Sequence, residues 1–483
     1  MRTLKTHHIV FLVCAAAAPL TVVSAGVTAA YAASGLAGVP LGYLICGGLV
    51  AMFALGFCAM AKEIPNTAAF FSYVSAGLGK SHGLAASWLA IISYSMMQTA
   101  LVCLLGFMAE DLLLRVTGRS VTWVLFSIVA VILVGTLGVR SADLASRIIG
   151  FLLILELLTV LFFCIVVLIN RGHDLAVGTF SPMSLIGGGT GTLLAFTIAG
   201  FMGIESSSMY AEETEDPGKT IPRATLISIA VISVFYGFSS WAIAQSVGED
   251  NVVTAAQEQG STLLFTYLGS HGFTALVPFL QALLVTSLFA AVVSFHNSIS
   301  RYLMALGREH VLWKSLGRVT ADGVPRTASV SQSCLAIVVV IAMWLTQKTL
   351  NMDDSFPSDI VFSWASNAGG FGLIFLFLVT SISVLRYFTR RERKYSSFIT
   401  IYSPVVAIVG FGAMFVLVLL NFKNLIGDAE LWYLVFVIPG VILSCGIAGF
   451  ARGEYLRKKR PAIYQNIGSG HSPELPCGES LGK

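Results

Sequence analysis

Charged residues are scarce in this sequence. Lys and Arg number 29 and Asp and Glu number 25 among 483 residues, which is 11% of the chain. A soluble domain carries about a quarter of its residues as charges, so a surface that meets only water is excluded. Apolar residues take the place of charge, because 56% of the residues are hydrophobic and the mean hydropathy is +0.83. We therefore expect an all-α, polytopic membrane protein.

Cysteine and histidine are also few, and they do not form ligand sets. Seven of the eight cysteines fall in apolar runs, Cys477 lies near the C-terminus, and their spacing is not that of a metal site. We expect packing thiols, no metal and no cofactor. His296 is the one histidine inside an apolar run. The paired groups that a membrane enzyme needs at one depth are therefore missing, and an enzyme is not expected.

Apolar runs long enough to cross a bilayer recur along the chain. A helix needs about 20 apolar residues to cross the hydrocarbon core. The first run follows Arg2 and Lys5 like a signal peptide, but it continues past a cleavage site and favours a first transmembrane helix. Twelve transmembrane helices are expected, at 9–34, 40–61, 83–108, 121–139, 146–169, 190–211, 222–246, 274–305, 327–346, 358–386, 399–421 and 431–450.

Basic residues are distributed unequally between the two sets of connecting loops. One set, with the tails, holds 24 of the 29, and the other set holds Arg115, Arg119, Arg171, Lys348 and Lys423. Loops rich in Lys and Arg stay in the cytoplasm, so both termini are expected there, with the protein in the plasma membrane. The basic runs then meet the headgroups of the lipid bilayer, and no nucleic-acid partner is expected.

Two apolar runs contain helix breakers at similar depth. The first holds Pro19 and then three small residues near mid-membrane, namely Ser24, Ala25 and Gly26. The sixth holds Gly200 and Gly203, followed by Glu205. Interrupted helices at matching positions of inverted repeats indicate the central binding site of a transporter. Close helix packing at small residues is the alternative.

The spacing of the two interrupted runs predicts an inverted repeat. Runs one and six are five apart, and a five-helix unit that repeats must enter the membrane the other way up. We expect a domain at 1–450, with a first repeat at about 9–169, a second at about 190–386 and two additional C-terminal helices at about 399–450. Residues 451–483 are then a cytoplasmic tail, which is expected to be disordered from Gly468 onward.

Four stretches carry a resemblance to a known family. The segment GIESSSMYAEETEDPGKTIPRA at 203–224 resembles the signature of the amino acid, polyamine and organocation (APC) superfamily permeases. PNTAAFFSYVSAGLG at 65–79, GVRSADLASR at 138–147 and NSISRYLMALGREHVL at 297–312 agree in the family's order. The resemblance implies a LeuT-type fold, alternating access, and a small amine or amino acid held between helices one and six.

Two departures from the family pattern leave the substrate open. The usual glycine, serine, glycine break in helix one is replaced here by Ser24, Ala25 and Gly26, and Trp313 replaces the usual proline after the eighth helix. Opening helix one at these small residues exposes N–H groups that suit a carboxylate. Opening helix six between Ala199 and Gly203 exposes carbonyl groups that suit an ammonium. One zwitterion satisfies both, so an amino acid is expected ahead of an amine or polyamine.

Side chains of helices three, six and ten are expected to shape this pocket, with core packing as the alternative for each. They are Tyr94, Gln98, Phe196, Phe201, Ser366 and Asn367. The opened segment itself, at Ala199, Gly200 and Gly203, is expected to contact the substrate. By resemblance, Ala199 stands where some relatives carry a gating aromatic residue, which predicts a larger pocket.

Two acidic residues in apolar runs are candidates for coupling, since a charge at this depth is costly. Glu205 is expected to cap N–H groups of the second half of helix six and to bridge to helix one, or to act as a local cap only. By resemblance, Glu156 of helix five stands where some relatives carry a lysine in place of a sodium ion. It is expected to exchange a proton, or to remain protonated and bonded to a neighbouring helix.

His296 and Asn297 of helix eight are expected to face the same region, with a packing histidine as the alternative to a proton relay. Coupling to protons is favoured over coupling to sodium. The acidic segment that follows helix six is expected to form an inner gate near Arg140 and Arg147, or a solvated hairpin; its acidic residues are Glu212, Glu213, Glu215 and Asp216.

These observations favour a secondary active transporter that imports an amino acid and couples its uptake to protons. An amine or polyamine transporter, an amino-acid exchanger and a transporter-like nutrient sensor remain as alternatives. The oligomeric state is not predicted.

Overall fold

The computed structural model describes residues 5–64, 68–138, 142–214, 216–320, 324–391, 394–423 and 434–470. The elements in these ranges are helices. In chain order they include α1 (Thr6–Ala16), α2 (Pro19–Thr21), η1 (Val22–Gly26), α3 (Val27–Ser34), α4 (Val39–Glu63), α5 (Ala69–Leu78), α6 (Lys80–Thr117), α7 (Trp123–Leu137), α8 (Ala142–Arg171), α9 (Pro182–Leu185), α10 (Thr190–Ala199), η3 (Ile204–Glu213), α11 (Pro217–Val247), α12 (Val252–Gln259), α13 (Leu263–Leu268), α14 (Val277–Arg308), α15 (Arg326–Thr349), η7 (Pro357–Phe362), α16 (Ser363–Thr389), η8 (Phe398–Tyr402), α17 (Ser403–Leu420), α19 (Leu434–Lys459) and α20 (Pro461–Asn466).

Within the described ranges, ten helical segments are long and apolar enough to cross a membrane. They correspond to ten of the twelve expected runs. The fourth run forms α7, which has 15 residues, and the sixth is divided into α10 and η3, with 10 residues each. The expectation of an all-helical, many-spanning chain is confirmed.

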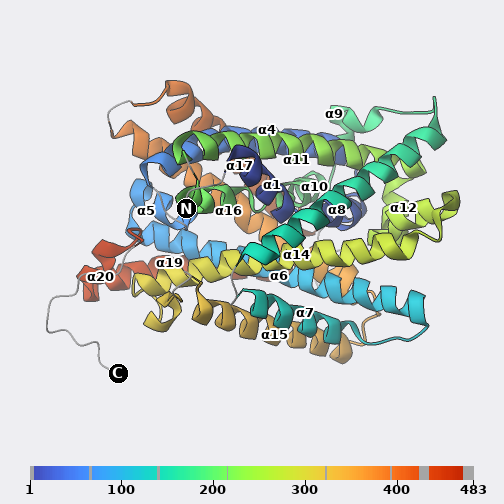
Figure 1. The fold of residues 1–483 in the computed structure, drawn as a ribbon. Coiled ribbons are helices and arrows are strands. Elements are labelled where there is room, and N and C mark those ends of the chain that lie inside the picture. Colours follow the sequence, from blue (N-terminus) through green and yellow to red (C-terminus); the bar gives the residue numbers. More distant parts are fainter. Residues whose placement is uncertain are drawn as a thin grey trace.

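The long helices run side by side in nearly the same direction (Figure 1). α4 packs against α11, and α6 packs against α14, α16 and α19. The short helices α9 and α12 lie at one end of this bundle, and α5 and α20 lie at the other. The middle of the bundle holds α1, α10 and α16. The candidate site therefore lies on interior helices that longer helices surround.

A glycine lets two of the interior helices approach closely. A Cβ atom on Gly370 of α16 would lie 2.7 Å from the carbonyl oxygen of Ala195 and 3.4 Å from the Cβ of Ala199, both on α10. A side chain at position 370 would therefore push α10 away. The glycine fixes the end of α10, where the sixth run is interrupted, against α16.

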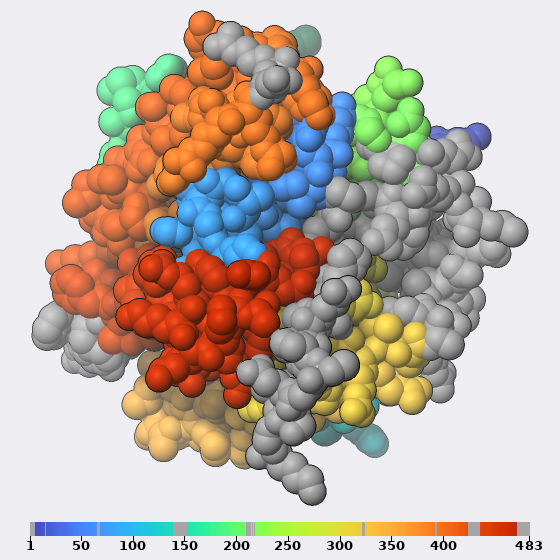
Figure 2. All heavy atoms as spheres, turned by 90° about the vertical axis from the view of Figure 1, so that its left-hand side faces the viewer, coloured from blue at the N-terminus to red at the C-terminus, as the bar shows by residue number. Residues whose placement is uncertain are grey.

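The C-terminal segment folds onto the body of the protein. α19 continues to Lys459 and α20 follows it, so much of the expected tail from 451 onward is helical. The N–H groups of Gly468 and Gly470 donate to the Glu309 carboxylate at 2.8 and 2.9 Å. Figure 2 shows red residues of this segment next to blue residues of the α5 and α6 region. Disorder from Gly468 onward is wrong for 468–470, and 471–483 lie outside the described residues.

Candidate functional site at two interrupted helices

The first membrane span is interrupted between α1 and α2. α1 ends at Ala16, Ala18 has the left-handed φ of 46°, and α2 begins at Pro19. Proline has no N–H to donate and disfavours a helical residue before it, which favours a break between α1 and α2 at this point. The hydroxyl of Tyr236 on α11 donates to the free carbonyl oxygen of Ala17 at 2.8 Å. A side chain of the neighbouring helix α11 therefore stabilises the interruption.

This interruption is not where the sequence placed it. Val22–Gly26 forms a π-helical turn, η1, that continues into α3, and Gly26 has the helical φ of −67°. The hydroxyl of Ser24 donates to the carbonyl oxygen of Leu20 at 2.7 Å within the same helix. Opening of helix one at Ser24, Ala25 and Gly26 is therefore wrong for this structure. Small residues only permit a helix to open, whereas Pro19 disfavours its continuation, and the break lies at Ala17 and Ala18.

The sixth run is interrupted where the sequence predicted. α10 ends at Ala199, and Gly203 has a φ of 102°, which favours glycine because other residues meet a steric penalty there. The chain then continues as the 3-10 helix η3. A Cβ on Gly203 would lie 3.7 Å from the Cβ of Ala16 at the end of α1. The two interruptions therefore lie against each other in the interior.

Glu205 fixes the second interruption to α6. Its carboxylate accepts hydrogen bonds from the Tyr94 hydroxyl and from the Gly203 N–H, the latter at 3.1 Å. Glu205 is 3% exposed and Tyr94 is 1% exposed. Glu205 thus satisfies an N–H that the interruption frees, as expected. Its partner across the site lies on α6, whereas the sequence predicted a bridge to helix one.

Glu156 joins three helices beside the first interruption. Its carboxylate accepts from the Ser287 hydroxyl of α14 at 2.7 Å, and Ser287 accepts from the Thr21 hydroxyl of α2 at 3.0 Å. Glu156 therefore ties α8 and α14 to the start of α2.

The predicted walls of the pocket form two groups, one aromatic, on the sixth run, and one polar, on α16. Phe196 and Phe201 are buried, and Phe201 lies near Tyr43 with ring centroids 6.4 Å apart. Gly200, also in the opened segment, lies near Tyr43, because a Cβ there would be 3.1 Å from the Tyr43 ring. Ser366 and Asn367 donate hydrogen bonds to carbonyl groups of the preceding turn. The Asn367 Oδ1 atom is buried without a hydrogen-bond partner.

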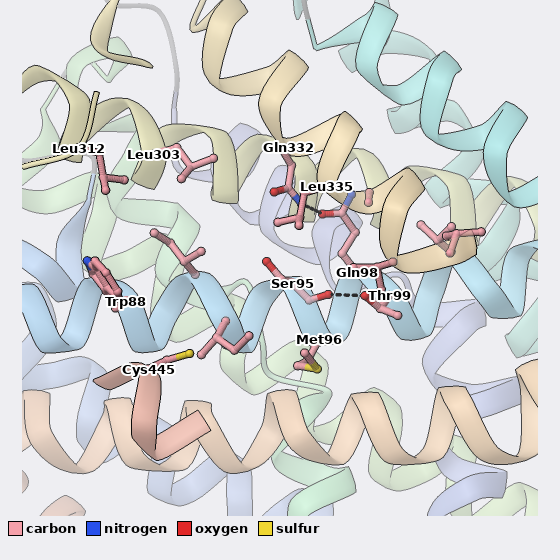
Figure 3. Close-up of a pocket in the computed structure, with 16 residues that line it drawn as sticks. Trp88, Ser95, Met96, Gln98, Thr99, Leu303, Leu312, Gln332, Leu335 and Cys445 are labelled. Carbon is pink, nitrogen blue, oxygen red and sulfur yellow. Dashed lines mark hydrogen bonds between the residues drawn. The ribbon is translucent and has the colours of Figure 1, made fainter. Parts of the chain in front are cut away.

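Three predicted residues lie away from the two interruptions. Gln98 accepts a hydrogen bond from Gln332 of α15 at 2.6 Å and lines a cavity between α6, α14, α15 and α19 (Figure 3). His296 bonds through Nε2 to the Ser329 hydroxyl of α15 at 2.8 Å. Asn297 is exposed. This contact with α15 agrees with the alternative that His296 is a packing residue. It does not place His296 beside Glu156, which contacts α14 at Ser287 instead.

The acidic segment after η3 is described only in part. Asp216 is exposed and pairs with Lys219 at 3.5 Å. The side chains of Glu212, Glu213 and Arg147 lie outside the described residues, as do Glu215 and Arg140 as a whole. The gate expected between these groups stays a prediction.

Several residues of the site were not found from the sequence. Tyr236, Ser287 and Thr21 hold the interruptions, but a tyrosine, a serine and a threonine in apolar helices are too common to single out. Their partners are more than 130 positions away in the chain. Only the packing of α2, α11 and α14 shows their role.

Many apolar helices around two adjacent interruptions, with a buried carboxylate at each, define a membrane carrier for a small polar solute. A family model described as amino acid permease matches residues 8–462. The chain belongs to the amino acid permease family, and it is a multi-pass membrane protein.

Individual relatives have low sequence identity to this chain. The chain is 23% identical over 440 residues to the branched-chain amino acid permease BcaP of Lactococcus lactis, covering 87% of this chain and 88% of the relative. It is 24% identical to the histidine permease HisP of the same species, covering 63% of this chain and 65% of the relative. For the lysine-specific permease LysP, also of Lactococcus lactis, identity is 23%, covering 62% and 61%. These matches support the family and not one substrate.

Proposed function

We propose that this protein is a secondary active transporter that imports an amino acid across the plasma membrane by alternating access. The observation that carries the proposal is the contact between the two interruptions, where Gly203 lies against Ala16. Each interruption frees backbone groups in the interior, and such groups are tolerated there when they bind a ligand or meet a buried side chain. The family supports an amino acid as the solute.

The proposed substrate site lies between η1 and the end of α10. The carbonyl groups that end α10 at Ala199 and Gly200 attract the ammonium of an amino acid, because this helix end is partially negative. The wide turn at Ser24, Ala25 and Gly26 receives the carboxylate, since π-helical turns frequently occur at functional sites. Tyr94, Phe196, Phe201, Ser366 and Asn367 are the proposed walls.

The proposed architecture follows the spacing of the two interruptions. Twelve transmembrane helices form a LeuT-type 5+5 inverted repeat with two additional helices in a domain at 1–450. The remaining residues, 451–483, lie in the cytoplasm with the N-terminus. The interrupted sixth span, α10 and η3, supports this count because its two short pieces together have the length of one span.

Coupling to protons is proposed ahead of coupling to sodium. Glu156 is 2% exposed and contacts α2 and α14 together, so a change in its protonation changes contacts at the first interruption. Glu205 acts in the same way at the second interruption through Tyr94. Both carboxylates thus connect a proton to helices that alternating access must move.

The test is uptake by the purified protein in sealed lipid vesicles. Labelled amino acids are offered one at a time under an inward proton gradient, an inward sodium gradient or no gradient. Saturable uptake of an amino acid that the proton gradient increases is expected. Absence of uptake for all twenty common amino acids, amines and polyamines under every gradient overturns the proposal.

The same vesicles separate the alternatives. Uptake that requires amino acid inside the vesicle indicates an exchanger, and uptake of amines alone indicates an amine or polyamine carrier. A transporter-like sensor binds its ligand without moving it. Thermal stabilisation by an amino acid that is never taken up would therefore favour the sensor.

A further inference from the structure

The segment that follows α19 turns back across one end of the helix bundle. Residues 460–470, which include α20, are called the strap here, and α20 and α5 lie at the same end of the bundle (Figure 1). The side chains of Ile463 and Ile467 are buried and belong to the same apolar core as the long helices. Burial of two isoleucines stabilises this position. The strap is therefore packed into the end of the protein.

On one side, the strap meets α5 and the start of α6. Gly468 lies against Ser75 of α5, because a Cβ at position 468 would be 2.8 Å from the Cβ of Ser75. Its φ of 83° also favours glycine. Lys80, the first residue of α6, donates a hydrogen bond to the carbonyl oxygen of Gln465. The strap thus contacts both α5 and α6.

On the other side, the strap meets the end of α14. Glu309 directly follows α14 and is fully buried. Each of its carboxylate oxygens accepts one backbone N–H, from Gly468 at 2.8 Å and from Gly470 at 2.9 Å. Gly468 therefore lies between two helices, with its N–H bonded to Glu309 after α14 and its Cα against Ser75 of α5.

α5 and α6 meet at a glycine that is suited to be a hinge. Gly79 joins them with a φ of 113° and a ψ of 160°, which other residues adopt only with a steric penalty. Among the described residues, the nearest atom to a Cβ at this position would be Nδ1 of His82, 3.9 Å away. Such a junction at the end of an element absorbs a change of angle without displacing neighbouring side chains. The angle between α5 and α6 therefore depends on what else holds α5.

The helices that the strap joins lead to the two interruptions. α5 packs against η3, which follows the second interruption and carries Glu205. α14 bonds to the start of α2, after the first interruption, through Ser287 and Thr21. The proposed alternating access moves helices around these two places relative to one another. A connection between α5 and the end of α14 opposes that movement at this end of the bundle.

We propose that the strap is an inhibitory contact, which holds this end of the protein closed while it is docked between α5 and the end of α14. Uptake is then fastest when the strap is released. Release requires breaking both hydrogen bonds to Glu309 and exposing Ile463 and Ile467, so docking and release form an equilibrium of the free protein. This inference rests on the proposed transport function, because inhibition is measured as a rate of uptake.

The first test locks the strap in place. In a background whose accessible cysteines are replaced by serine, Ser75→Cys and Ser469→Cys supply two thiols close together, since Ser469 follows Gly468. A bismaleimide with a disulfide in its spacer joins them, and dithiothreitol cuts it. Vesicles that hold the full-length protein are offered a radiolabelled mixture of the twenty common amino acids under an inward proton gradient. The cross-link is expected to slow initial uptake several-fold, and dithiothreitol is expected to restore it.

The second test releases the strap. Gly468→Val forces a side chain against Ser75, so it is expected to speed hydrogen exchange across 461–470 and to raise initial uptake several-fold. Gly118→Val is the matched control, because Gly118 has a similar φ of 70° and a Cβ there would meet no described atom within 4 Å. Thermal unfolding checks that both variants fold.

The outcomes separate the strap from the transport function. Uptake that the cross-link leaves unchanged, or equal uptake by the two valine variants, overturns the inhibitory role alone. Absence of uptake from every sample, with the strap locked, docked or released, overturns the proposed transport function and the inhibitory role with it. Slower uptake when locked and faster uptake when released supports both.

Discussion

Glu156 accepts a hydrogen bond from the hydroxyl of Ser287 at 2.7 Å. This contact joins the middle of α8 to α14, and Thr21 extends it to the start of α2. Three helices thus meet at one titratable group, and the proposed alternating access would move them relative to one another. Protonation of Glu156 weakens its acceptor strength toward Ser287. In the proposed proton coupling, this contact is the route from a proton to the first interruption.

Replacing Glu156 by glutamine is expected to weaken the response of uptake to a proton gradient several-fold. Glutamine keeps an oxygen that accepts from Ser287 but cannot exchange a proton, so substrate binding is expected to be largely retained. Uptake in vesicles measures the first property, and thermal stabilisation by substrate measures the second. Glu258→Gln is the control because Glu258 is exposed on α12. Full stimulation by the gradient in Glu156→Gln would refute the role of Glu156.

Tyr94→Phe is expected to lower uptake and to destabilise the protein by about 1 to 3 kcal/mol, because the buried Glu205 loses a donor. The ring still packs on Phe295 and Tyr302, whose centroids lie 6.0 and 5.9 Å from it. Tyr43→Phe is the matched control, since the buried Tyr43 hydroxyl has no hydrogen-bond partner among the described residues. Thermal unfolding and initial uptake rates measure the difference. Equal effects of the two substitutions would contradict a particular role for the Tyr94 hydroxyl.

Pro19→Ala is expected to close the first interruption. Alanine supplies an N–H and relaxes the restriction on Ala18, so α1 gains the ability to continue into α2. Hydrogen exchange measured by mass spectrometry is expected to slow across 15–22, and uptake is expected to fall. Pro40→Ala is the control, because Pro40 lies in the first turn of α4, where proline only replaces a free donor. Unchanged exchange in Pro19→Ala would show that tertiary contacts alone maintain the break.

Docking of the C-terminal segment is expected to weaken as the pH rises. Glu309 lies outside the membrane-spanning helices and is 0% exposed, and burial raises its pKa from 4.5 to about 7. The N–H groups of Gly468 and Gly470 and the charge of Lys80 oppose this shift without overcoming it. The docked state therefore binds the proton more tightly than the released state. The equilibrium constant for docking is therefore largest below the ordinary pKa of 4.5. Between that value and the raised pKa of about 7 it falls by up to about tenfold per pH unit.

A spin label at Ser469→Cys, in a background whose accessible cysteines are replaced by serine, measures this docking. The label is expected to become more mobile between pH 5 and pH 8, and the neutral variant Glu309→Gln is expected to remove the dependence. Lys80 also donates to the carbonyl oxygen of Gln465, so it contributes to docking at every pH. A pH dependence that persists unchanged in Glu309→Gln assigns it to another group.

Local signals in the sequence explain the predictions that hold. Runs of apolar residues specify spanning helices because lipid leaves no partner for an open backbone. Gly203 marks the second interruption because only glycine adopts its φ without a penalty. The first interruption was misplaced because the prediction relied on the small residues at 24–26, which only permit a helix to open, and gave less weight to Pro19, which disfavours a continuous helix.

The sequence by itself determined that this chain is helical, crosses a membrane many times and has a break in its sixth apolar run at Gly203. These properties follow from composition and from the backbone limits of single residues. The tertiary structure alone decided that Glu205 meets Tyr94, 111 positions away, and that Gln98 turns toward Gln332 on α15. A helix in lipid is apolar on nearly every face, so its pattern does not fix its rotation. The packing of α6 against its neighbours sets which polar side chain faces which partner.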